Sequence, residues 1–349
     1  MTQNLDYQPL VLVETENLSR DEWLAYRRRG IGGSDAAAVL GISPFRTGRD
    51  LYFDKRGIAV PDDETNWVAK EVGNLLEDLV ARIFTKKTGL RVFKRPYMFQ
   101  HPYYPWMLAD LDYLVELPDG TLAVLECKTT NYNAKDKWWN NGIETVPVYY
   151  ESQGRHYMAV VNLSRVYFCC LYGNNEDEVI IRHIDRDMAY EQELIVLEDI
   201  FWHDHVLAEN PPDYTEDGDL ILESLRRSQG AVDTAAPPVV LTPPQSTRVE
   251  RFLELQAEKA IRDAEVRLLE KEMQRMKALI VADMGTSCKA TYEDVHGGYT
   301  VTYNPYQKAG IAKADLERLK ELHPDIYMEF VTVSENRRFQ VKRTMPDVA

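Results

Sequence analysis

The feature that most constrains the fold is a pair of strand-like segments, 107–116 and 121–128, separated by Pro118-Asp119-Gly120. A three-residue loop with glycine in the left-handed position is typical of a tight hairpin, and it pairs Leu117 with Thr121. The sequence therefore predicts an antiparallel hairpin whose register is fixed by its turn.

Two acidic residues face each other in this register. Counting back along both strands places Asp112 directly opposite Glu126, and opposed β-carbons lie about 4.5 to 5.5 Å apart. Lys128 shares a face with Glu126, because residues two apart on a strand point the same way. Asp110 shares a face with Asp112 and is a rival candidate. Two such carboxylates repel each other unless a cation lies between them.

An all-oxygen, partly hydrated site of this kind suits Mg²⁺, which takes oxygen ligands at about 2.1 Å. The ion would bind a scissile phosphate and lower the pKa of an attacking water, and Lys128 would orient or deprotonate that water. A Glu-x-Lys tripeptide is also common as a salt bridge on an exposed strand.

Glu77 lies on a predicted core-packed helix that spans 67–84, beside its apolar stripe. Gly73, one turn earlier, removes a side chain, so Glu77 could face the hairpin. A glutamate at the rim of the core is the alternative. We include Glu77 among the candidate site residues.

Gly32-Gly33-Ser34-Asp35 precedes a short alanine-rich helix and predicts Ser34 as its N-cap. A hydroxyl, free amides and the positive end of a helix dipole together suit a phosphate. The run Arg27-Arg28-Arg29 lies a few residues upstream. A plain N-cap explains Ser34 equally well, and Asp35 would repel a bound anion.

Residues 1–210 read as an α/β core, because helical and strand-like patterns alternate along them. Residues 211–246 turn rich in Pro, Asp, Ser and Ala, which predicts an acidic, Pro-rich linker. Residues 247–349 then predict a long helix and a small α+β unit. In this unit the helix runs from a capping box at Thr247 to about Met284. The later predicted elements are strands at 298–303, 327–333 and 338–342 and a helix at 313–322.

The composition fits a soluble globular protein. The net charge of −15 argues against a protein that simply coats DNA, so any DNA contact must be local. Since no apolar run approaches the length of about 20 residues that a membrane helix needs, and the N-terminus lacks the basic start of a signal peptide, we expect a cytoplasmic protein. The four cysteines match neither a disulfide framework nor a metal-binding pattern.

Five short motifs carry a resemblance to a known family. They are Ile31-Gly32-Gly33-Ser34-Asp35-Ala36-Ala37 with Gly41-Ile42-Ser43-Pro44; Gly73-Asn74-Leu75-Leu76-Glu77; Ala109-Asp110-Leu111-Asp112; Leu125-Glu126-Cys127-Lys128-Thr129-Thr130; and Tyr150 and Gln153 before His156-Tyr157-Met158. In this order they resemble the YqaJ-like viral recombinase family, which belongs with phage lambda exonuclease in the PD-(D/E)XK nuclease superfamily. The resemblance covers roughly residues 18–170. Leu111 departs from the pattern, because many superfamily members have proline there.

The resemblance implies a PD-(D/E)XK nuclease core, in which helices flank a central mixed sheet. It implies Mg²⁺, with Mn²⁺ as a possible substitute, held by Asp112, Glu126 and the Cys127 carbonyl. Lys128 would lie at the attacking water, and Gln153 would support the site.

The remaining implied roles concern Glu77 and the DNA end. Glu77 would bind through water or a second metal. Ser34 and one residue of the triple arginine, Arg27 or Arg28 foremost, would match the family's 5′-phosphate pocket.

The resemblance implies a processive 5′→3′ exonuclease that acts on double-stranded DNA ends and leaves 3′ single strands for a single-strand annealing protein. A homo-oligomer, a ring-shaped trimer by resemblance, would explain processivity. A structure-specific or restriction-type endonuclease is one alternative, because the same metal site cuts DNA in either mode. A non-catalytic module that binds DNA or a partner is another, and the intact Asp112, Glu126 and Lys128 argue against it.

Overall fold

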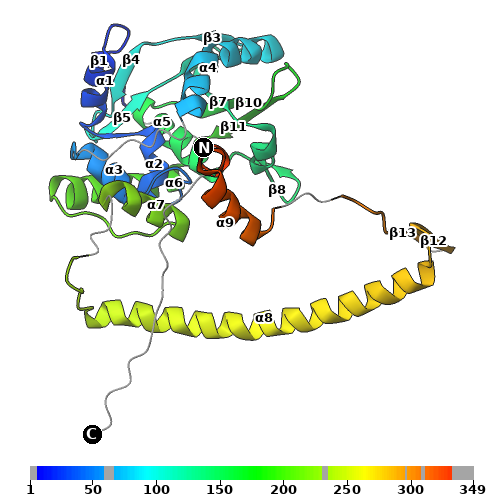
Figure 1. Ribbon diagram of the computed structural model, residues 1–349. Coiled ribbons are helices and arrows are strands. Elements are labelled where there is room, and N and C mark those ends of the chain that lie inside the picture. The colour runs from blue at the N-terminus through cyan, green and yellow to red at the C-terminus, as the bar shows by residue number, and fades with distance from the viewer. Residues whose placement is uncertain (1–5, 59–66, 230–234, 295–296, 308–310, 332–349) are drawn as a thin grey trace. The chain divides into compact units, whose positions relative to one another are not determined.

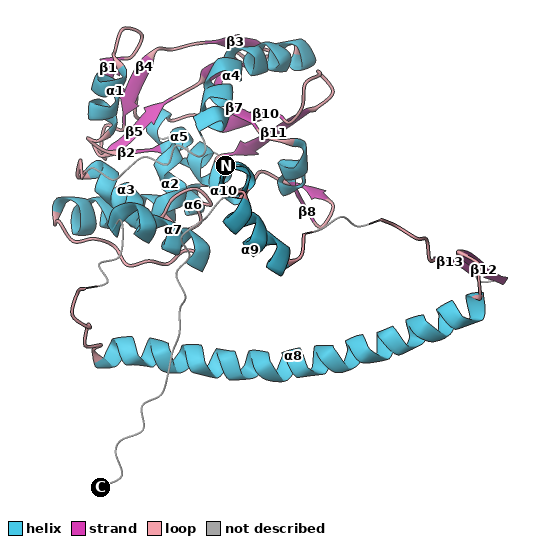
Figure 2. Ribbon diagram, in the orientation of Figure 1, coloured by secondary structure: helices cyan, strands magenta, loops and turns pink. Residues whose placement is uncertain are grey.

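The structure is a computed structural model that describes residues 6–58, 67–229, 235–294, 297–307 and 311–331. The chain divides into two compact units, Met1–Thr234 and Ala235–Ala349. The first unit carries the two larger sheets of the described residues, and the second carries a long helix, a hairpin and two short helices (Figures 1 and 2).

The first unit is built around a five-stranded mixed sheet in the order β11-β10-β7-β6-β3. Its strands are β3 (Arg91–Phe93), β6 (Tyr113–Glu116), β7 (Leu122–Thr129), β10 (Arg165–Leu171) and β11 (Val179–Asp185). Strands β7 and β10 are parallel, and the other pairs are antiparallel. A parallel pair needs a long crossover, and α5 (Val148–Val161) lies within it.

A second, four-stranded sheet has the order β1-β4-β5-β2. Its strands are β1 (Leu10–Glu14), β2 (Ile31–Gly32), β4 (Tyr97–Gln100) and β5 (Met107–Asp110). The predicted single strand 107–116 is therefore wrong in one respect. It breaks at Leu111-Asp112, so β5 joins this sheet whereas β6 joins the five-stranded one.

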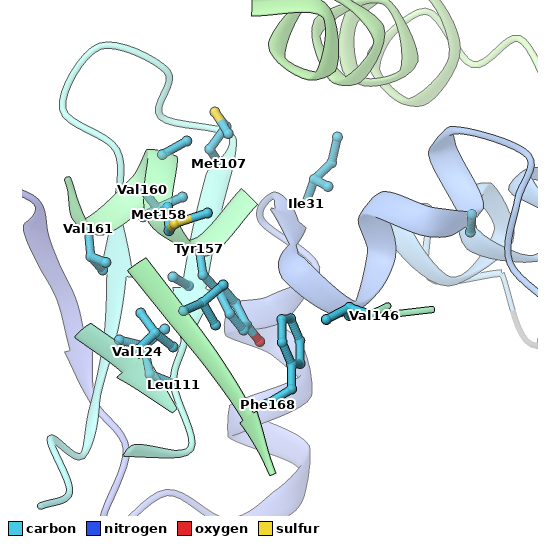
Figure 3. Packing of buried hydrophobic residues seen from close by; sticks show 14 of the residues in the cluster. Ile31, Met107, Leu111, Val124, Val146, Tyr157, Met158, Val160, Val161 and Phe168 are labelled. Atoms are coloured by element: carbon cyan, nitrogen blue, oxygen red, sulfur yellow. The ribbon is translucent and has the colours of Figure 1, made fainter. Parts of the chain in front are cut away.

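Helices cover both faces of the five-stranded sheet. Helix α4 (Trp67–Thr88) packs on one face against a cluster that includes Leu125 and Cys169. Helix α5 packs on the other face, which carries Val124 and Phe168 (Figure 3). Since neighbouring residues of a strand point to opposite faces, one run of apolar residues in β7 serves both clusters.

Within its described residues, the first unit contains five further α-helices. They are α1 (Arg20–Arg27), α2 (Gly33–Val39), α3 (Gly48–Lys55), α6 (Met188–Ile200) and α7 (Gly218–Gln229), with a 3₁₀ helix at Tyr132–Trp138 and a π-helix at Phe201–Leu207. A small hairpin is formed by β8 (Trp139–Asn140) and β9 (Ile143–Glu144).

Helix α7 corrects the predicted linker. Residues 218–229 are helical, and they belong to the first unit because Ser224 donates a hydrogen bond to Asp50 at 2.7 Å and Arg227 pairs with Asp50 at 3.0 Å. The acids at 213–223 that suggested a linker instead lie before and within a helix anchored by a buried serine. The division of the chain falls after Thr234 rather than at 210.

The second unit begins with α8 (Pro243–Met284). Its N-cap is Thr242, with Gln245 completing the capping box, so the predicted start at Thr247 is five residues late. Proline is tolerated in a first helical turn, and the Pro243-Pro244 pair therefore opens the helix. No helix in the described ranges combines the length and apolarity that crossing a bilayer requires.

Beyond α8 come the antiparallel strands β12 (Lys289–Asp294) and β13 (Gly297–Thr302) and the helices α9 (Lys313–Leu322) and α10 (Pro324–Phe330). The predicted strand at 298–303 and helix at 313–322 are confirmed. The predicted strand at 327–333 is wrong over its described part, because Pro324 opens a helix that its aromatic composition did not indicate. The predicted strand at 338–342 lies outside the described residues.

Candidate active site

The register predicted from the Pro118-Asp119-Gly120 turn is present in the structure. The Leu117 amide donates to the Thr121 carbonyl at 2.9 Å, and Gly120 has a φ of 81°. Strand pairing continues back to Tyr113, which faces Leu125. The next step of the same register is Asp112 opposite Glu126.

Asp112 is held at the break between the two sheets. One of its carboxylate oxygens, Oδ2, accepts a hydrogen bond from the Cys127 amide at 2.8 Å. This bond bridges the end of β6 to β7 where strand pairing stops. Asp112, Glu126, Cys127 and Lys128 line one pocket of about 800 Å³ together with Gln153.

Glu126 is 1% exposed, and its oxygen Oε1 is buried without a hydrogen-bond partner. Burial raises the pKa of Glu126 above its ordinary value, although the charge of Lys128 acts in the opposite direction. Burial likewise raises the pKa of Asp112 well above its ordinary value, and the charge of Glu126 adds to the shift. Buried polar atoms almost always have a hydrogen-bond partner. The chain provides none for this oxygen, so a bound group from outside the chain would have to supply it.

Lys128 and Gln153 surround the second oxygen of Glu126. The Lys128 ammonium donates to Glu126 Oε2 at 2.8 Å and to Gln153 Oε1 at 3.0 Å. The Gln153 amide closes the ring by donating to the same Glu126 oxygen at 2.8 Å. Burial would lower the pKa of Lys128, but the charges of Glu126 and Asp112 outweigh it and raise that pKa. Lys128 is therefore held as an ammonium ion in this arrangement.

The donor set fits a hard divalent cation through oxygen ligands. No group of three or more His, Cys, Asp or Glu side chains in the described part of the chain is placed to hold a metal ion. The buried Glu126 carboxylate with its unpartnered Oε1, the partly buried Asp112 carboxylate and the Cys127 carbonyl are nevertheless ligands that Mg²⁺ accepts when water supplies the rest. Any ion bound here would keep several of its waters.

Two other acids at this side of the pocket already have partners. Glu77 lines the pocket, as its place beside the stripe predicted, but it pairs with Lys94 at 3.0 Å. Asp110, the rival of Asp112, accepts a hydrogen bond from the Trp23 indole at 2.6 Å. The geometry therefore favours Asp112 over Asp110 as the partner of Glu126.

The opposite wall of the pocket is formed by α2 and α1. Arg27 donates to the Ser34 hydroxyl at 2.8 Å, and both residues line the pocket. Arg28 instead points to Asp54, at 3.4 Å, and does not line the pocket. Of the two predicted arginines, the structure brings only Arg27 to Ser34.

Ser34 is not the N-cap that the sequence predicted. Helix α2 begins at Gly33, with Gly32 as the N-cap, and the Asp35 side chain accepts from the Gly32 amide at 2.9 Å. A capping acid three residues on takes the place of a capping serine. The Ser34 hydroxyl is thereby left to Arg27 and the pocket.

Asp35 is the residue whose surroundings the sequence did not reveal. It is fully buried and pairs with Arg27 at 3.0 Å, with Lys55 at 2.6 Å and with Arg46. Burial alone would raise the pKa of Asp35, but Lys55 and the two arginines outweigh it and hold that pKa far below its ordinary value. Three basic side chains surround the single carboxylate, so the group as a whole is cationic. Contrary to the expectation from sequence, Asp35 therefore does not repel an anion. An acid among small apolar residues was the one signal, since buried acids are almost always paired.

Two consecutive tryptophans, Trp138 and Trp139, follow the candidate site residues of β7 along the chain. Trp138 is buried in the core beside Tyr150, and Trp139 is partly exposed with Arg182 over its ring at 5.3 Å. Trp138 is therefore part of the packed core.

The first unit is thus an α/β fold in which helices flank a mixed sheet, and one hairpin carries an acidic pair and a lysine.

Comparison of sequences gives the family. Residues 22–164 match the model of the YqaJ-like viral recombinase domain. The chain is also similar to "Uncharacterized protein YqaJ" of Bacillus subtilis (strain 168), with 31% identity over 336 residues, which is 95% of this chain and 97% of that protein. The chain therefore belongs to the YqaJ-like viral recombinase family.

Two solved structures align with part of the chain. An alkaline exonuclease from Laribacter hongkongensis aligns with 54% of this chain and 94% of its own, at 20% identity and a TM-score of 0.43. A phage-related exonuclease from Haemophilus somnus 129PT aligns with 52% of this chain and 96% of its own, at 11% identity and a TM-score of 0.38. The family assignment rests on the sequence matches.

Proposed function

We propose that the chain is a Mg²⁺-dependent 5′→3′ exonuclease that acts on double-stranded DNA ends and leaves 3′ single strands for homologous recombination. The observation that carries the proposal is the buried Glu126 oxygen without a partner, facing Asp112 and beside Lys128. Burying charged carboxylates without compensation is costly, so the arrangement makes physical sense around a cation.

Asp112, Glu126 and the Cys127 carbonyl would hold the ion, and Mn²⁺ could substitute for Mg²⁺. When bound, the ion would neutralise charge on the scissile phosphate and lower the pKa of a nearby water. Lys128 would orient the attacking water and offset charge that builds on the phosphate. Gln153 holds both Lys128 and Glu126 in place. Glu77 would join the site through water.

The wall of the pocket that carries Arg27 and Ser34, here called the cationic wall, would bind the DNA end. Arg27 and the Ser34 hydroxyl project into the pocket, and Arg46 and Lys55 keep the buried Asp35 neutralised. Guanidinium groups bind phosphates through strong charge-assisted hydrogen bonds. A terminal 5′-phosphate bound here would place a nearby phosphodiester at Asp112, Glu126 and Lys128, here called the carboxylate wall. This arrangement favours cutting from an end.

The deciding experiment compares linear duplexes that carry 5′-phosphate or 5′-hydroxyl ends, digested with Mg²⁺ by the wild type and by Ser34→Ala. We expect faster digestion of phosphorylated ends by the wild type and loss of that preference in the variant. Ser228→Ala, on α7 outside the pocket, is the matched control. Efficient cutting of closed circular DNA would contradict the exonuclease mode and favour an endonuclease.

We further propose a single-strand annealing protein as a partner and a homotrimer as the working assembly. Both rest on family membership. The mass of the purified protein in solution, with and without DNA, tests the assembly, and a monomer that degrades DNA processively would contradict it.

A further inference from the structure

Tyr157 lies between the two walls of the pocket. It comes from α5, about one turn after Gln153, and it is 6% exposed. It lines the pocket together with Ser34 of the cationic wall and Glu126 of the carboxylate wall. Figure 3 shows Tyr157 among the buried hydrophobic residues, and its hydroxyl meets the side chain of Gln153, which also lines the pocket.

The ring of Tyr157 is fixed from the cationic wall. A β-carbon added at Gly33 would lie 2.5 Å from Cε1 of Tyr157, closer than any real contact. The start of α2 therefore rests directly on the ring, and only glycine allows this approach. A change in the position of α2 would be felt by Tyr157.

The hydroxyl of Tyr157 is fixed from the carboxylate wall. Its oxygen accepts a hydrogen bond from Gln153 Nε2 at 3.4 Å, and that same amide nitrogen donates to Glu126. Within the described residues, no acceptor takes the hydroxyl's own proton. Burial raises the pKa of Tyr157 well above 10, and the charges of Glu126 and Asp112 raise it further. The hydroxyl thus keeps its proton at any pH at which the enzyme would work.

We propose that Tyr157 is a substrate-contacting residue whose hydroxyl donates a hydrogen bond to a backbone phosphate oxygen of DNA lying between Ser34 and Glu126. The inference rests on the proposed exonuclease function and deepens it. One wall fixes the ring and the other fixes the hydroxyl oxygen, so the donated hydrogen bond has a set position relative to both. Tyr157 would thereby set which bond, counted from the terminal phosphate, reaches the carboxylates.

The test is Tyr157→Phe, which removes the hydroxyl and keeps the ring against Gly33. Tyr52→Phe is the matched control, because Tyr52 is a buried tyrosine of the same hydrophobic cluster that does not line the pocket. The substrate is a 5′-phosphorylated linear duplex labelled at its 5′ end, digested with Mg²⁺. The readouts are kcat, KM, the melting temperature and the length of the first labelled product.

We expect Tyr157→Phe to lower kcat about tenfold, in line with the loss of one hydrogen bond from an uncharged donor, and to change KM less. The first product should change from one length to a mixture of lengths, while Tyr52→Phe keeps both the rate and the length. The melting temperatures of the two variants should agree, since each loses one hydroxyl.

Wild-type kcat and a single product length in Tyr157→Phe would overturn the inference while leaving the exonuclease proposal intact. A lower rate with unchanged product length and a melting temperature well below that of Tyr52→Phe would also overturn it, because the hydroxyl would then only support the fold. A wild type that does not degrade linear DNA would instead refute the proposed function.

Discussion

The two sides of the pocket each hold a buried acid, but the charges around the two acids differ. Asp35 and Glu126 are both fully buried acids. Asp35 is surrounded by Arg27, Arg46 and Lys55, and its pKa is held far below the ordinary value. Glu126 has one lysine and one oxygen without a partner, and burial raises its pKa.

The Asp35 group stabilises the fold, whereas we propose that Asp112 and Glu126 hold the ion required for the reaction. The Asp35 group is complete, because its cations come from the chain itself. The Asp112 and Glu126 pair is incomplete, because Lys128 is shared and no second cation of the described chain contacts either carboxylate. A buried charge that folding leaves uncompensated marks a place where a ligand finishes the structure.

The largest expected effect comes from Glu126→Gln, which keeps the shape of the side chain and removes its charge. Nuclease activity should fall by about 10³-fold or more, as expected when a preorganised electrostatic group is lost. The free energy of unfolding without metal should not fall, because a neutral amide is cheaper to bury than a carboxylate. Digestion rates and urea unfolding of the variant measure both. A destabilised variant would contradict the contrast with Asp35.

Asp35→Asn should do the reverse and destabilise the fold. Removing one partner from a buried ionic group leaves uncompensated charges and costs about 3–5 kcal/mol. Asp54→Asn is the control, because Asp54 pairs with Arg28 and Arg46 while partly exposed. That change should cost less than about 1 kcal/mol. Equal losses in the two variants, measured by urea unfolding, would mean that the Asp35 group contributes little.

Mg²⁺ should stabilise the wild type and leave Glu126→Gln almost unchanged. At a concentration 100 times its dissociation constant, an ion that binds only the folded state adds about 2.7 kcal/mol. Thermal unfolding with Mg²⁺ and with EDTA measures the difference, and Ca²⁺ serves as a comparison. A shift of the same size in both proteins would place the ion elsewhere.

The stability of the metal-free protein should fall as pH rises above the ordinary range for carboxylates. Because the folded-state pKa values of Asp112 and Glu126 are raised, the folded protein holds more protons than the unfolded chain between the ordinary and the raised values. Each such proton changes the free energy of unfolding by about 1.4 kcal/mol per pH unit. Urea unfolding in EDTA from pH 5 to 8 should show a shallower slope for Glu126→Gln.

The smallest effects separate the two arginines. Arg27→Ala should reduce the preference for 5′-phosphorylated ends about tenfold, because a charge-assisted hydrogen bond to phosphate is lost. Arg28→Ala should stay close to the wild type, since its guanidinium lies on Asp54. Competition between phosphorylated and hydroxyl ends in one reaction measures both variants. A larger loss in Arg28→Ala would reverse the choice between them.

The hairpin could be predicted because its determinants are local. The Pro118-Asp119-Gly120 turn fixes the register, and the alternation of side chains fixes which residues share a face. The break at Leu111-Asp112 could not be predicted in the same way. The apolar pattern runs on through it, and only the pairing of β5 with β4 moves the strand into another sheet.

The Asp35 group shows the other limit. Lys55 and Arg46 lie 20 and 11 residues beyond Asp35 in the chain, and only the packing of α3 near α2 brings Lys55 to it. Helix α7 was missed for a related reason, because Ser224 and Arg227 reach across to Asp50 of α3. Composition describes the segment, whereas a tertiary contact decides its structure.

Because the strand breaks at Leu111-Asp112, the two walls of the pocket belong to different sheets. The cationic wall is connected to the four-stranded sheet, because β2 pairs with β5 and continues directly into α2. The carboxylate wall belongs to the five-stranded sheet through β6 and β7. If the chain cuts DNA from an end as proposed, the spacing between the bound DNA end and the bond to be cut would depend on the junction between the two sheets. A substitution at that junction would then change the length of the cut product without altering a reactive group.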